Sequence, residues 1–350
     1  MDERSKLKNG QEILLAERKQ PENIRIFHIE NVINEGSTVI CYEALNEDRT
    51  KGVLKEFYPR TAYGLERNSQ GQLIHSEKYK AAFKRFTREE KEYIDTYEML
   101  SAEKQSGLYS DMETFIPHFE LYYGCDDIGK KTGTTYIWTP HPQIETFEKI
   151  CSEIHADPYT EPEHKLVLVL SAIKSLTECI CSLHCAGMLH RDIKPSNFGF
   201  LKCGDELLTQ SVSIVDVDSI CSVYKYPEKI VYTEGYAEPE VDDDLPCNQT
   251  DIYSIGATLF HAVIITVETQ KSGYKYKQSY FDNLQELVSR SELICASETN
   301  AHPYIKQMIT NILKKCLCRR ESRYANCEEL LEDINDLLSF LRPTASDRFF

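Results

Sequence analysis

The hydrophobic pattern of the chain changes near residue 140, and this change constrains the fold more than any other feature. Before it, short apolar runs bounded by turn residues, typical of β-strands, occupy residues 24–29, 39–44 and 52–58. After it, apolar residues recur at helical spacing, first over residues 165–186 and then over most of residues 251–339. The sequence therefore predicts an α+β chain with a β-rich front third and a helical remainder.

Four further segments complete the predicted organisation. Residues 80–104 have helical spacing, and residues 116–139 return to strand character. Residues 60–78 indicate an irregular polar insertion, and residues 1–22 are polar apart from a short apolar patch, for which we expect a short helix. The expected parts are an N-terminal extension (1–22), a β-rich lobe (23–139), a helical lobe (140–341) and a C-terminal tail (342–350).

The charge balance argues against several classes of function. Lys and Arg number 40 and Asp and Glu number 56, which gives a net charge of −16. A chain this acidic is not held on nucleic acid or on an anionic membrane by bulk charge. No run of about 18 apolar residues predicts a membrane span, and the N-terminus lacks the apolar core of a secretory signal. We expect a cytoplasmic protein.

The 13 cysteines form no regular framework. They are interleaved with apolar residues, as around Cys179 and Cys316, and the paired C-x-x-C knuckles of a zinc site do not appear. This pattern favours mostly free, buried thiols in a reducing compartment over disulfides or zinc.

The densest group of polar side chains directly follows the long helix predicted over residues 165–186. It reads His-Arg-Asp-Ile-Lys-Pro-Ser-Asn and contributes Asp192, Lys194 and Asn197. Downstream, a short strand-like run ends at Asp216 and would present this carboxylate at its end. We expect the two loops to lie side by side, so that these side chains surround one small volume.

Such a set of side chains suits phosphoryl transfer, whose transition state spreads charge over phosphoryl oxygens that divalent ions neutralise. Mg²⁺ prefers oxygen ligands, and Asp216 and Asn197 offer them. Asp192 would orient a substrate hydroxyl and accept its proton, and Lys194 would hold the transferred γ-phosphate as a compact cation. The other interpretation is a solvated loop without chemistry.

The same run resembles the catalytic loop of the eukaryotic-type protein kinase family, which includes the bacterial Hanks-type Ser/Thr kinases. In this resemblance Asp192 matches the catalytic Asp, Asn197 the metal-binding Asn, and Asp216 the Asp of the D-F-G segment, which here reads Asp-Val-Asp. The resemblance covers roughly residues 24–341. It implies a bilobal fold with a β-rich N-lobe and a helical C-lobe, and ATP in the cleft between them.

Lys55 and Glu89 match a further pair of positions in the family. Lys55 ends a Gly-Val-Leu-Lys run that resembles the V-A-I-K strand, so it would contact the α- and β-phosphates of ATP. Glu89 ends an Arg-Phe-Thr-Arg-Glu run similar to a helix of bacterial members, so it would pair with Lys55. We expect the neighbouring Glu90 and Glu92 to be solvated surface charges.

The predicted nucleotide pocket departs from the family pattern. Its phosphate loop keeps only Gly36 of the usual glycines, and Ser37 would add a hydroxyl donor. Position 199 is Gly where a Leu floor is usual, and Phe198 or Phe200 would fill that place. The resemblance implies that four further residues line the pocket: Val39, Cys41, Val53 and the gatekeeper Thr139.

Residues 233–240 resemble the family's G-T-x-x-Y-x-A-P-E segment, with Glu238 in place of the usual Ala. The resemblance implies that Thr233 orients the substrate and that Glu240 pairs with Arg323. Asp251 would accept backbone N–H bonds from the catalytic loop, or would instead cap its helix.

Three functions remain open at this point. The first is a Ser/Thr protein kinase that transfers the γ-phosphate of ATP to a protein hydroxyl, with Mg²⁺ or Mn²⁺ as cofactor. The second is a pseudokinase that binds nucleotide or protein on the same fold. The third is a small-molecule kinase. Residues 235–240 and Asp251 argue against it, because they build a platform for a protein substrate. The expected partners are ATP and a Ser- or Thr-containing protein, without nucleic acid and without a membrane span.

Overall fold

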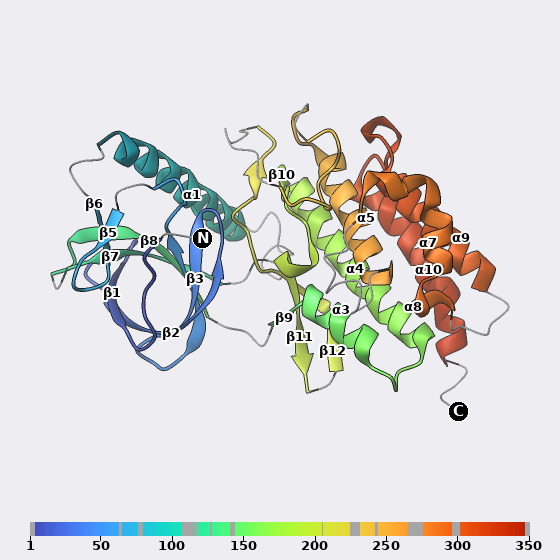
Figure 1. The fold of residues 1–350 in the computed structure, drawn as a ribbon, viewed down its shortest axis with the longest axis horizontal. Coiled ribbons are helices and arrows are strands. Elements are labelled where there is room, and N and C mark those ends of the chain that lie inside the picture. The colour runs from blue at the N-terminus through green and yellow to red at the C-terminus, as the bar shows by residue number, and fades with distance from the viewer. Residues whose placement is uncertain are drawn as a thin grey trace. The chain divides into compact units, whose positions relative to one another are not determined.

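Six antiparallel strands of the first part of the chain close into a barrel in the order β1-β2-β3-β4-β8-β7 (Figure 1). The computed structural model describes residues 4–62, 65–75, 80–106, 116, 118–126, 128–140, 144–204, 206–224, 232–241, 244–264, 276–295 and 302–346. The chain divides into two units, residues 1–102 with 117–143 and residues 103–116 with 144–350. The elements up to residue 140 are β1 (Glu12–Glu17), β2 (Ile24–Glu35), β3 (Val39–Leu45), β4 (Lys51–Phe57), β5 (Leu65–Arg67), β6 (Leu73–His75), α1 (Lys80–Ser106), β7 (Glu120–Cys125) and β8 (Lys131–Pro140).

The barrel core is built from alternate residues of the strands, because successive side chains of a strand point to opposite faces. Tyr42 of β3, Phe27 of β2 and Trp138 of β8 are among its buried members. The rings of Phe27 and Trp138 meet edge to face with their centroids 5.0 Å apart. Closure pairs the edges of these six strands with one another, which protects them from edge-to-edge association.

β1 corrects the prediction for the N-terminal residues, because the apolar patch at residues 13–16 forms a strand and the expected short helix is wrong. Ile13 pairs with Phe27 of β2, and Leu15 pairs with Gly124 of β7. So short an apolar run has no period that separates helix from strand. The two neighbouring strands decide the outcome, and residues 12–17 are part of the barrel.

The polar segment of residues 60–78, for which we expected an irregular insertion, contains the hairpin β5–β6. Arg67 of this hairpin reaches the fully buried Glu56 of β4, with Nη2 and Oε2 2.6 Å apart. The hydroxyls of Tyr42 and Tyr136 donate to the same carboxylate at 2.9 and 2.7 Å. The barrel tolerates this buried charge because it is paired and fully hydrogen-bonded.

Helix α1 confirms the helix predicted over residues 80–104 and packs on the outside of the barrel. The ring of Phe57 at the end of β4 lies 5.3 Å from that of Phe86 and 5.1 Å from that of Tyr93, measured between centroids. Phe86 and Tyr93 are two helical turns apart on one face, so this face of α1 is the one that contacts the sheet.

The second unit is mostly helical, as predicted, and its longest described helix is α4. Short strands precede and follow the loop that carries the predicted catalytic residues. The elements are β9 (Ile144–Thr146), α3 (Phe147–Ala156), α4 (Pro162–Cys185), β10 (Met188–Leu189), β11 (Phe198–Cys203), β12 (Glu206–Ile214), β13 (Cys221–Ser222), α5 (Asn248–Ile264), α7 (Leu284–Ser289), α8 (Glu292–Cys295), α9 (His302–Leu317) and α10 (Cys327–Ser346).

The apolar stripe predicted for α4 is confirmed. Its members are at most 2% exposed: Leu166, Val169, Leu170, Ile173, Leu176 and Ile180. Helices α5 and α10 and strand β12 contact α4 (Figure 1). Within the described ranges, α4 is the one helix long and apolar enough to cross a membrane, and 61% of its most apolar window is buried inside the structure. A helix that is buried in a protein core has the same composition.

Candidate active site

The loop that follows β10 carries the predicted catalytic residues and is held by Asp251 of α5. The backbone N–H groups of His190 and Arg191 donate to the two carboxylate oxygens of Asp251, each at 2.8 Å. The ring of His184 in α4 approaches the same carboxylate, with Nε2 and Oδ2 2.9 Å apart. The prediction that Asp251 binds the loop's N–H groups is therefore confirmed.

This anchor fixes the backbone next to Asp192. Burial alone would raise the pKa of Asp251, but its contacts with His184 and His190 hold it below the ordinary value, so the carboxylate stays charged. Arg191 has a φ of 68°, a left-handed conformation that costs a residue with a side chain about 1–2 kcal/mol. A charged acceptor that binds two successive N–H groups offsets this cost.

Asp192, Lys194 and Thr233 form one hydrogen-bonded cluster. Lys194 Nζ lies 2.8 Å from Asp192 Oδ2 and 2.8 Å from Thr233 Oγ1. The Thr233 hydroxyl donates to Asp192 Oδ1 at 2.6 Å. A carboxylate that binds a hydroxyl beside an ammonium group can orient an alcohol and take its proton.

Asn197 is hydrogen-bonded to this cluster, and Asp216 is connected to Asn197 through the backbone. Asn197 Nδ2 donates to the backbone carbonyl of Asp192 at 2.8 Å and to its carboxylate at 3.0 Å, which leaves the amide oxygen of Asn197 for a cation. The N–H of Val215 donates to the Asn197 carbonyl at 2.8 Å, so Asp216 follows directly on a residue bonded to Asn197. An amide oxygen and a carboxylate are ligands that fit Mg²⁺. The structure thus brings these predicted residues together within the second unit.

In the Asp-Val-Asp segment, the two residues that differ from the family pattern, Val217 and Asp218, both have defined positions in the structure. Val217 is buried, at 4% exposure. The backbone N–H of Asp218 donates to Asp216 Oδ1 at 3.2 Å, so the residue that replaces glycine helps to orient the carboxylate before it.

In the first unit, the predicted nucleotide residues share one side of the barrel wall. They are Val39 and Cys41 of β3, Val53 and Lys55 of β4, and Thr139 of β8. Lys55 pairs with Cys41, and Val53 pairs with Thr139. The alternate residues of β4, Leu54 and Glu56, face the barrel core, so this set faces outward. Lys55 is nevertheless only 8% exposed.

Glu89 of α1 has two described partners. Its Oε1 lies 2.7 Å from Nε of Arg85, four residues earlier, and its Oε2 accepts a hydrogen bond from Thr61 at 3.0 Å. The pairing of Glu89 with Lys55 stays a prediction.

The expectation that Glu90 is a solvated surface charge is wrong. Glu90 is 7% exposed, and it accepts a hydrogen bond from the Thr135 hydroxyl of β8 at 2.8 Å. It lies one turn after Phe86 and three residues before Tyr93, on the face of α1 that contacts the barrel. The position of Glu90 on the barrel-facing side of α1, more than its charge, determines that its side chain is buried.

The turn between β2 and β3, which is the predicted phosphate loop, is fastened by an arginine that the sequence did not single out. Arg4 donates to the backbone carbonyl of Gly36 at 2.7 Å and also to that of Tyr58. The backbone N–H of Arg60 donates to the carbonyl of Ser37 at 2.9 Å. Arg4 lies in a polar stretch without any motif, so only the folded structure identifies its contact with the loop.

Gly199 is explained by a close approach of two strands. A Cβ at this position would lie 2.2 Å from Cγ2 of Ile144 and 2.9 Å from the carbonyl of Glu145, because β11 pairs with β9 there. The flanking Phe198 and Phe200 are both buried. Ile144 therefore occupies the space into which a larger side chain at position 199 would extend.

Glu238, which stands where the family has Ala, is the centre of a buried ion cluster. Its fully buried side chain binds the guanidinium groups of Arg320 and Arg323 and accepts a hydrogen bond from Thr250 at 2.6 Å. Arg323 Nη2 also lies 2.9 Å from Glu240 Oε2, which confirms the predicted pair. Burial alone would raise the pKa of Glu238, but hydrogen bonds from Arg320 and Thr250 hold it below the ordinary value.

A neutral histidine links the same segment to α5. Nδ1 of His261 lies 2.8 Å from the hydroxyl of Tyr236. Burial lowers the pKa of His261 to about 4, and the nearby His155 acts in the same direction. The folded protein therefore resists protonation of His261 over a range in which an exposed histidine takes up a proton.

We expect the free energy of unfolding to fall as the pH is lowered from about 6.5, the ordinary pKa of histidine. The unfolded state binds a proton that the folded state excludes until about pH 4, so stability falls across this interval. The variant His261→Gln should weaken this dependence by roughly 1–2 kcal/mol at about pH 5, as measured by urea unfolding. The exposed His164→Gln is the control, and equal slopes in both variants would contradict the assignment.

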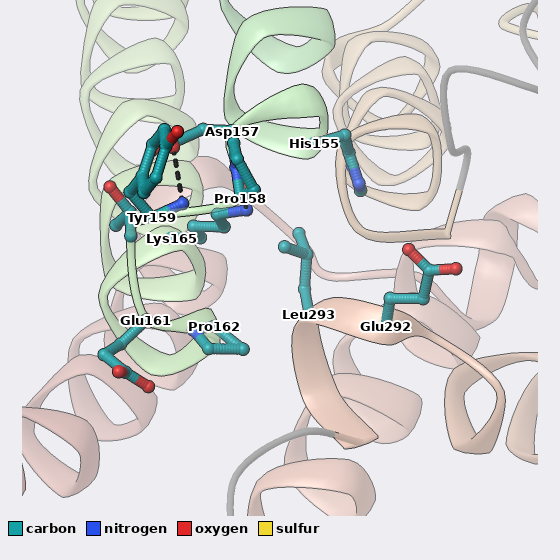
Figure 2. Close-up of a pocket in the computed structure, with 10 residues that line it drawn as sticks. His155, Asp157, Pro158, Tyr159, Glu161, Pro162, Lys165, Glu292 and Leu293 are labelled. Atoms are coloured by element: carbon teal, nitrogen blue, oxygen red, sulfur yellow. Dashed lines mark hydrogen bonds between the residues drawn. The ribbon is translucent and has the colours of Figure 1, made fainter.

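A separate pocket lies in the second unit and contains none of the residues predicted to act in phosphoryl transfer (Figure 2). The ammonium group of Lys165 is held there by the backbone carbonyl of Asp157. The lining comes from the end of α3, the connection to α4, the start of α4 and α8: His155, Asp157, Pro158, Tyr159, Thr160, Glu161, Pro162, Lys165, Glu292 and Leu293.

The chain is similar to kinases of bacteria and of eukaryotes. The serine/threonine-protein kinase PknD of Protochlamydia amoebophila (strain UWE25) is 27% identical over 229 residues, covering 59% of this chain and 22% of that protein. PknD of Chlamydia felis (strain Fe/C-56) is 26% identical over 241 residues, covering 57% and 25%. The dual specificity protein kinase zak2 of Dictyostelium discoideum is 28% identical over 170 residues, covering 47% and 23%. The chain thus spans about a quarter of the length of these relatives.

Solved structures agree on the fold. A Toxoplasma gondii specific rhoptry antigen kinase domain superposes with a TM-score of 0.59 at 16% identity, covering 96% of this chain and 88% of that chain. The BubR1 kinase domain superposes with a TM-score of 0.57 at 16% identity, covering 99% and 89%. The predicted α+β, bilobal fold class is confirmed. Residues 124–334 match the protein kinase domain family, and because this match spans more than half of the chain, the chain belongs to that family.

Proposed function

We propose that the chain is a Mg²⁺-dependent Ser/Thr protein kinase that transfers the γ-phosphate of ATP to a hydroxyl of a protein substrate. The observation that carries this proposal is the cluster in which Asp192 holds a hydroxyl, that of Thr233, at 2.6 Å and the ammonium group of Lys194 at 2.8 Å. A carboxylate in this setting is prepared for a second alcohol, the one to be phosphorylated.

In the proposed reaction, the substrate oxygen forms a bond to the γ-phosphorus while the bond from that phosphorus to the β–γ bridging oxygen breaks and releases ADP. The hydroxyl proton passes to Asp192, and Lys194 balances negative charge on the transferred group. Asn197 and Asp216 would hold Mg²⁺, which when bound neutralises charge on the phosphate oxygens. Lys55 would bind the α- and β-phosphates.

Two observations support Ser or Thr as the acceptor. The chlamydial relatives are named serine/threonine-protein kinases. In this chain, Lys194 lies two residues after Asp192 and binds both Asp192 and Thr233, and the loop that carries it resembles the Ser/Thr-directed type. The protein that is phosphorylated is left to experiment.

The direct test incubates the purified chain with labelled ATP and Mg²⁺, or Mn²⁺, and follows label transfer to the chain itself and to generic protein substrates. Transfer that is abolished by EDTA and by Asp216→Ala supports the proposal. Label that reaches a small molecule and never a protein would establish the small-molecule kinase instead.

The replacement Lys55→Met should lower kcat/KM for ATP by about 10²-fold, because a preorganised cation next to phosphate oxygens contributes about 2.7–4 kcal/mol. Lys51→Met is the matched control, since Lys51 is exposed at the start of the same strand. Steady-state kinetics with varied ATP measure the effect. Equal effects of the two replacements would contradict the role given to Lys55.

The phosphate loop is the observation that favours the second function, a pseudokinase. The loop keeps only Gly36 of the family's glycines, and its carbonyls at Gly36 and Ser37 are bound by Arg4 and Arg60. Such a loop has less freedom to adapt to phosphates. A thermal shift with ATP that is not accompanied by label transfer would establish this function.

A further inference from the structure

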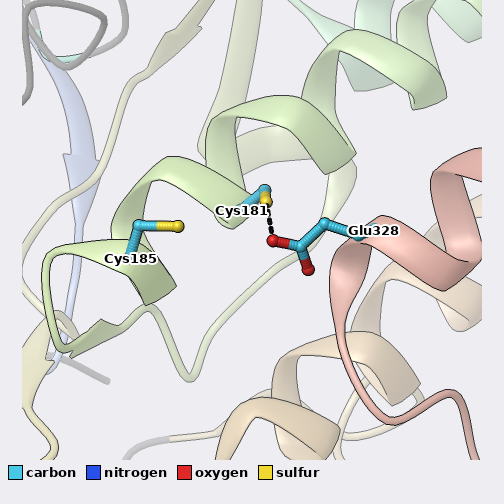
Figure 3. A group of neighbouring side chains, drawn as sticks. All are labelled: Cys181, Cys185 and Glu328. Carbon is cyan, nitrogen blue, oxygen red and sulfur yellow. Dashed lines mark hydrogen bonds between the residues drawn. The ribbon is translucent and has the colours of Figure 1, made fainter.

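Two cysteines and a glutamate converge where the C-terminal end of α4 meets the start of α10. Cys181 and Cys185 lie four residues apart, hence on one face of α4, and Glu328 reaches them from the first turn of α10. Their two sulfur atoms and a carboxylate oxygen all lie within 4.8 Å of one another. Figure 3 shows the thiols and the carboxylate pointing into the same space.

The chemistry of these atoms suits a thiophilic divalent cation. Thiolates select zinc over Mg²⁺ or Ca²⁺, and a carboxylate is a common additional zinc ligand. Ligand atoms around one tetrahedral zinc lie about 3.3–3.8 Å apart. Cys181 Sγ already lies 3.2 Å from Glu328 Oε1, so small side-chain rotations would close the site.

The local structure favours a metal over a disulfide. Cβ atoms four residues apart on a helix are about 5–6 Å apart, whereas a disulfide needs about 3.5–4.5 Å. Two ligands at this spacing on one helical face are the arrangement of helical zinc sites. Cys181 is half-buried and Cys185 and Glu328 are exposed, so an ion and a water molecule can reach the site.

We propose that Cys181, Cys185 and Glu328 bind one Zn²⁺ per chain, with water as the fourth ligand. Binding displaces the two thiol protons and joins α4 to α10. The proposal does not depend on phosphoryl transfer, and the C-x-x-x-C spacing lies outside the C-x-x-C pattern by which zinc knuckles are recognised.

The proposed zinc site lies next to His184, which contacts the anchor of the catalytic loop. Cys185 is adjacent to His184, whose ring contacts Asp251, the anchor of the catalytic loop. Next to Glu328, the sulfur of Cys327 lies 3.6 Å from Nδ1 of the same His184. A metal at this junction would therefore immobilise α4, which carries His184, against α10, whose Cys327 contacts His184.

The test is a titration of the full chain with Co²⁺, because Co²⁺ bound by thiolates absorbs strongly in the near ultraviolet. A non-thiol reductant keeps the cysteines reduced without competing for the metal. We expect one equivalent of Co²⁺ to produce the thiolate band and Zn²⁺ to remove it. Cys181→Ser and Cys185→Ser should abolish the band, and Glu328→Gln should weaken binding about tenfold or more. The controls are Cys318→Ser, which alters a half-buried cysteine, and Glu332→Gln, which alters an exposed carboxylate of α10. Both should keep the thiolate band.

Thermal unfolding gives a second readout. Zn²⁺ should raise the unfolding temperature of the unaltered chain and of the two control variants, because a ligand that binds only the folded state stabilises it. It should not do so for Cys185→Ser. Absence of a thiolate band in the unaltered chain, its persistence in Cys181→Ser, or its loss in Cys318→Ser would each overturn the proposal.

Discussion

Replacement of Asp192 by Asn should reduce the rate of phosphoryl transfer by about 10³-fold, the size of effect expected when a general base is removed. Asn keeps the volume of the side chain and an oxygen that accepts the Thr233 hydroxyl, but it does not take up the substrate proton. The expected loss is therefore in kcat, while the KM for ATP changes little. Single-turnover transfer with labelled ATP measures the chemical step directly.

The control for this experiment is Asp282→Asn, which alters an exposed carboxylate of the same unit. Circular dichroism and thermal unfolding should be unchanged for both variants. Transfer by Asp192→Asn at the rate of the unaltered chain would show that Asp192 is not the base. Loss of ATP binding in this variant would show that its role lies in structure.

Replacement of Glu238 by Gln should destabilise the second unit by about 3–5 kcal/mol, because two guanidinium groups lose the fully buried carboxylate that they share. The side chain of Arg323 is fully buried and, among the described residues, would keep Glu240 as its one carboxylate partner. Its guanidinium also lies over the ring of Tyr253, 4.8 Å from the ring centroid, and cannot move to water without breaking that contact. Thermal and urea unfolding measure the loss.

The exposed Glu234→Gln, four residues earlier in the same segment, should leave stability within about 0.5 kcal/mol of the unaltered chain. A double-mutant cycle with Arg323→Gln adds a second measure. If Glu238 and Arg323 form the unit described, the double variant should lose less than the sum of the two single losses. Strict additivity would contradict the buried cluster.

Much of the candidate site was visible in the sequence because its chemistry is concentrated in short runs. The loop from His190 to Asn197 and the strand end at Asp216 contain the residues that the structure brings together. The anchor Asp251 and the pair Glu240–Arg323 were implied by the resemblance to the kinase family. A motif of this kind fixes local geometry, so residue order alone indicates which atoms will meet.

Other features were not predicted, because they depend on which distant segments pack together. Glu90 is buried only because helical phase places it between Phe86 and Tyr93 against the barrel. Arg67 belongs to a segment that appeared irregular, yet it neutralises a carboxylate inside the barrel. Arg67 carries no local signal that separates it from solvated neighbours. For Glu90 the spacing from Phe86 and Tyr93 was such a signal, but the prediction followed its charge instead.

The sequence by itself predicted the change from strands to helices near residue 140 and the loop residues proposed for phosphoryl transfer, because periodicity and short motifs are local properties. Only the tertiary structure decided that residues 12–17 close a barrel and that Glu238 is the centre of an ion cluster. It alone placed Glu328 beside the two thiols of α4. These outcomes are set by contacts between residues far apart in the chain, whose burial and pairing energies no local pattern encodes.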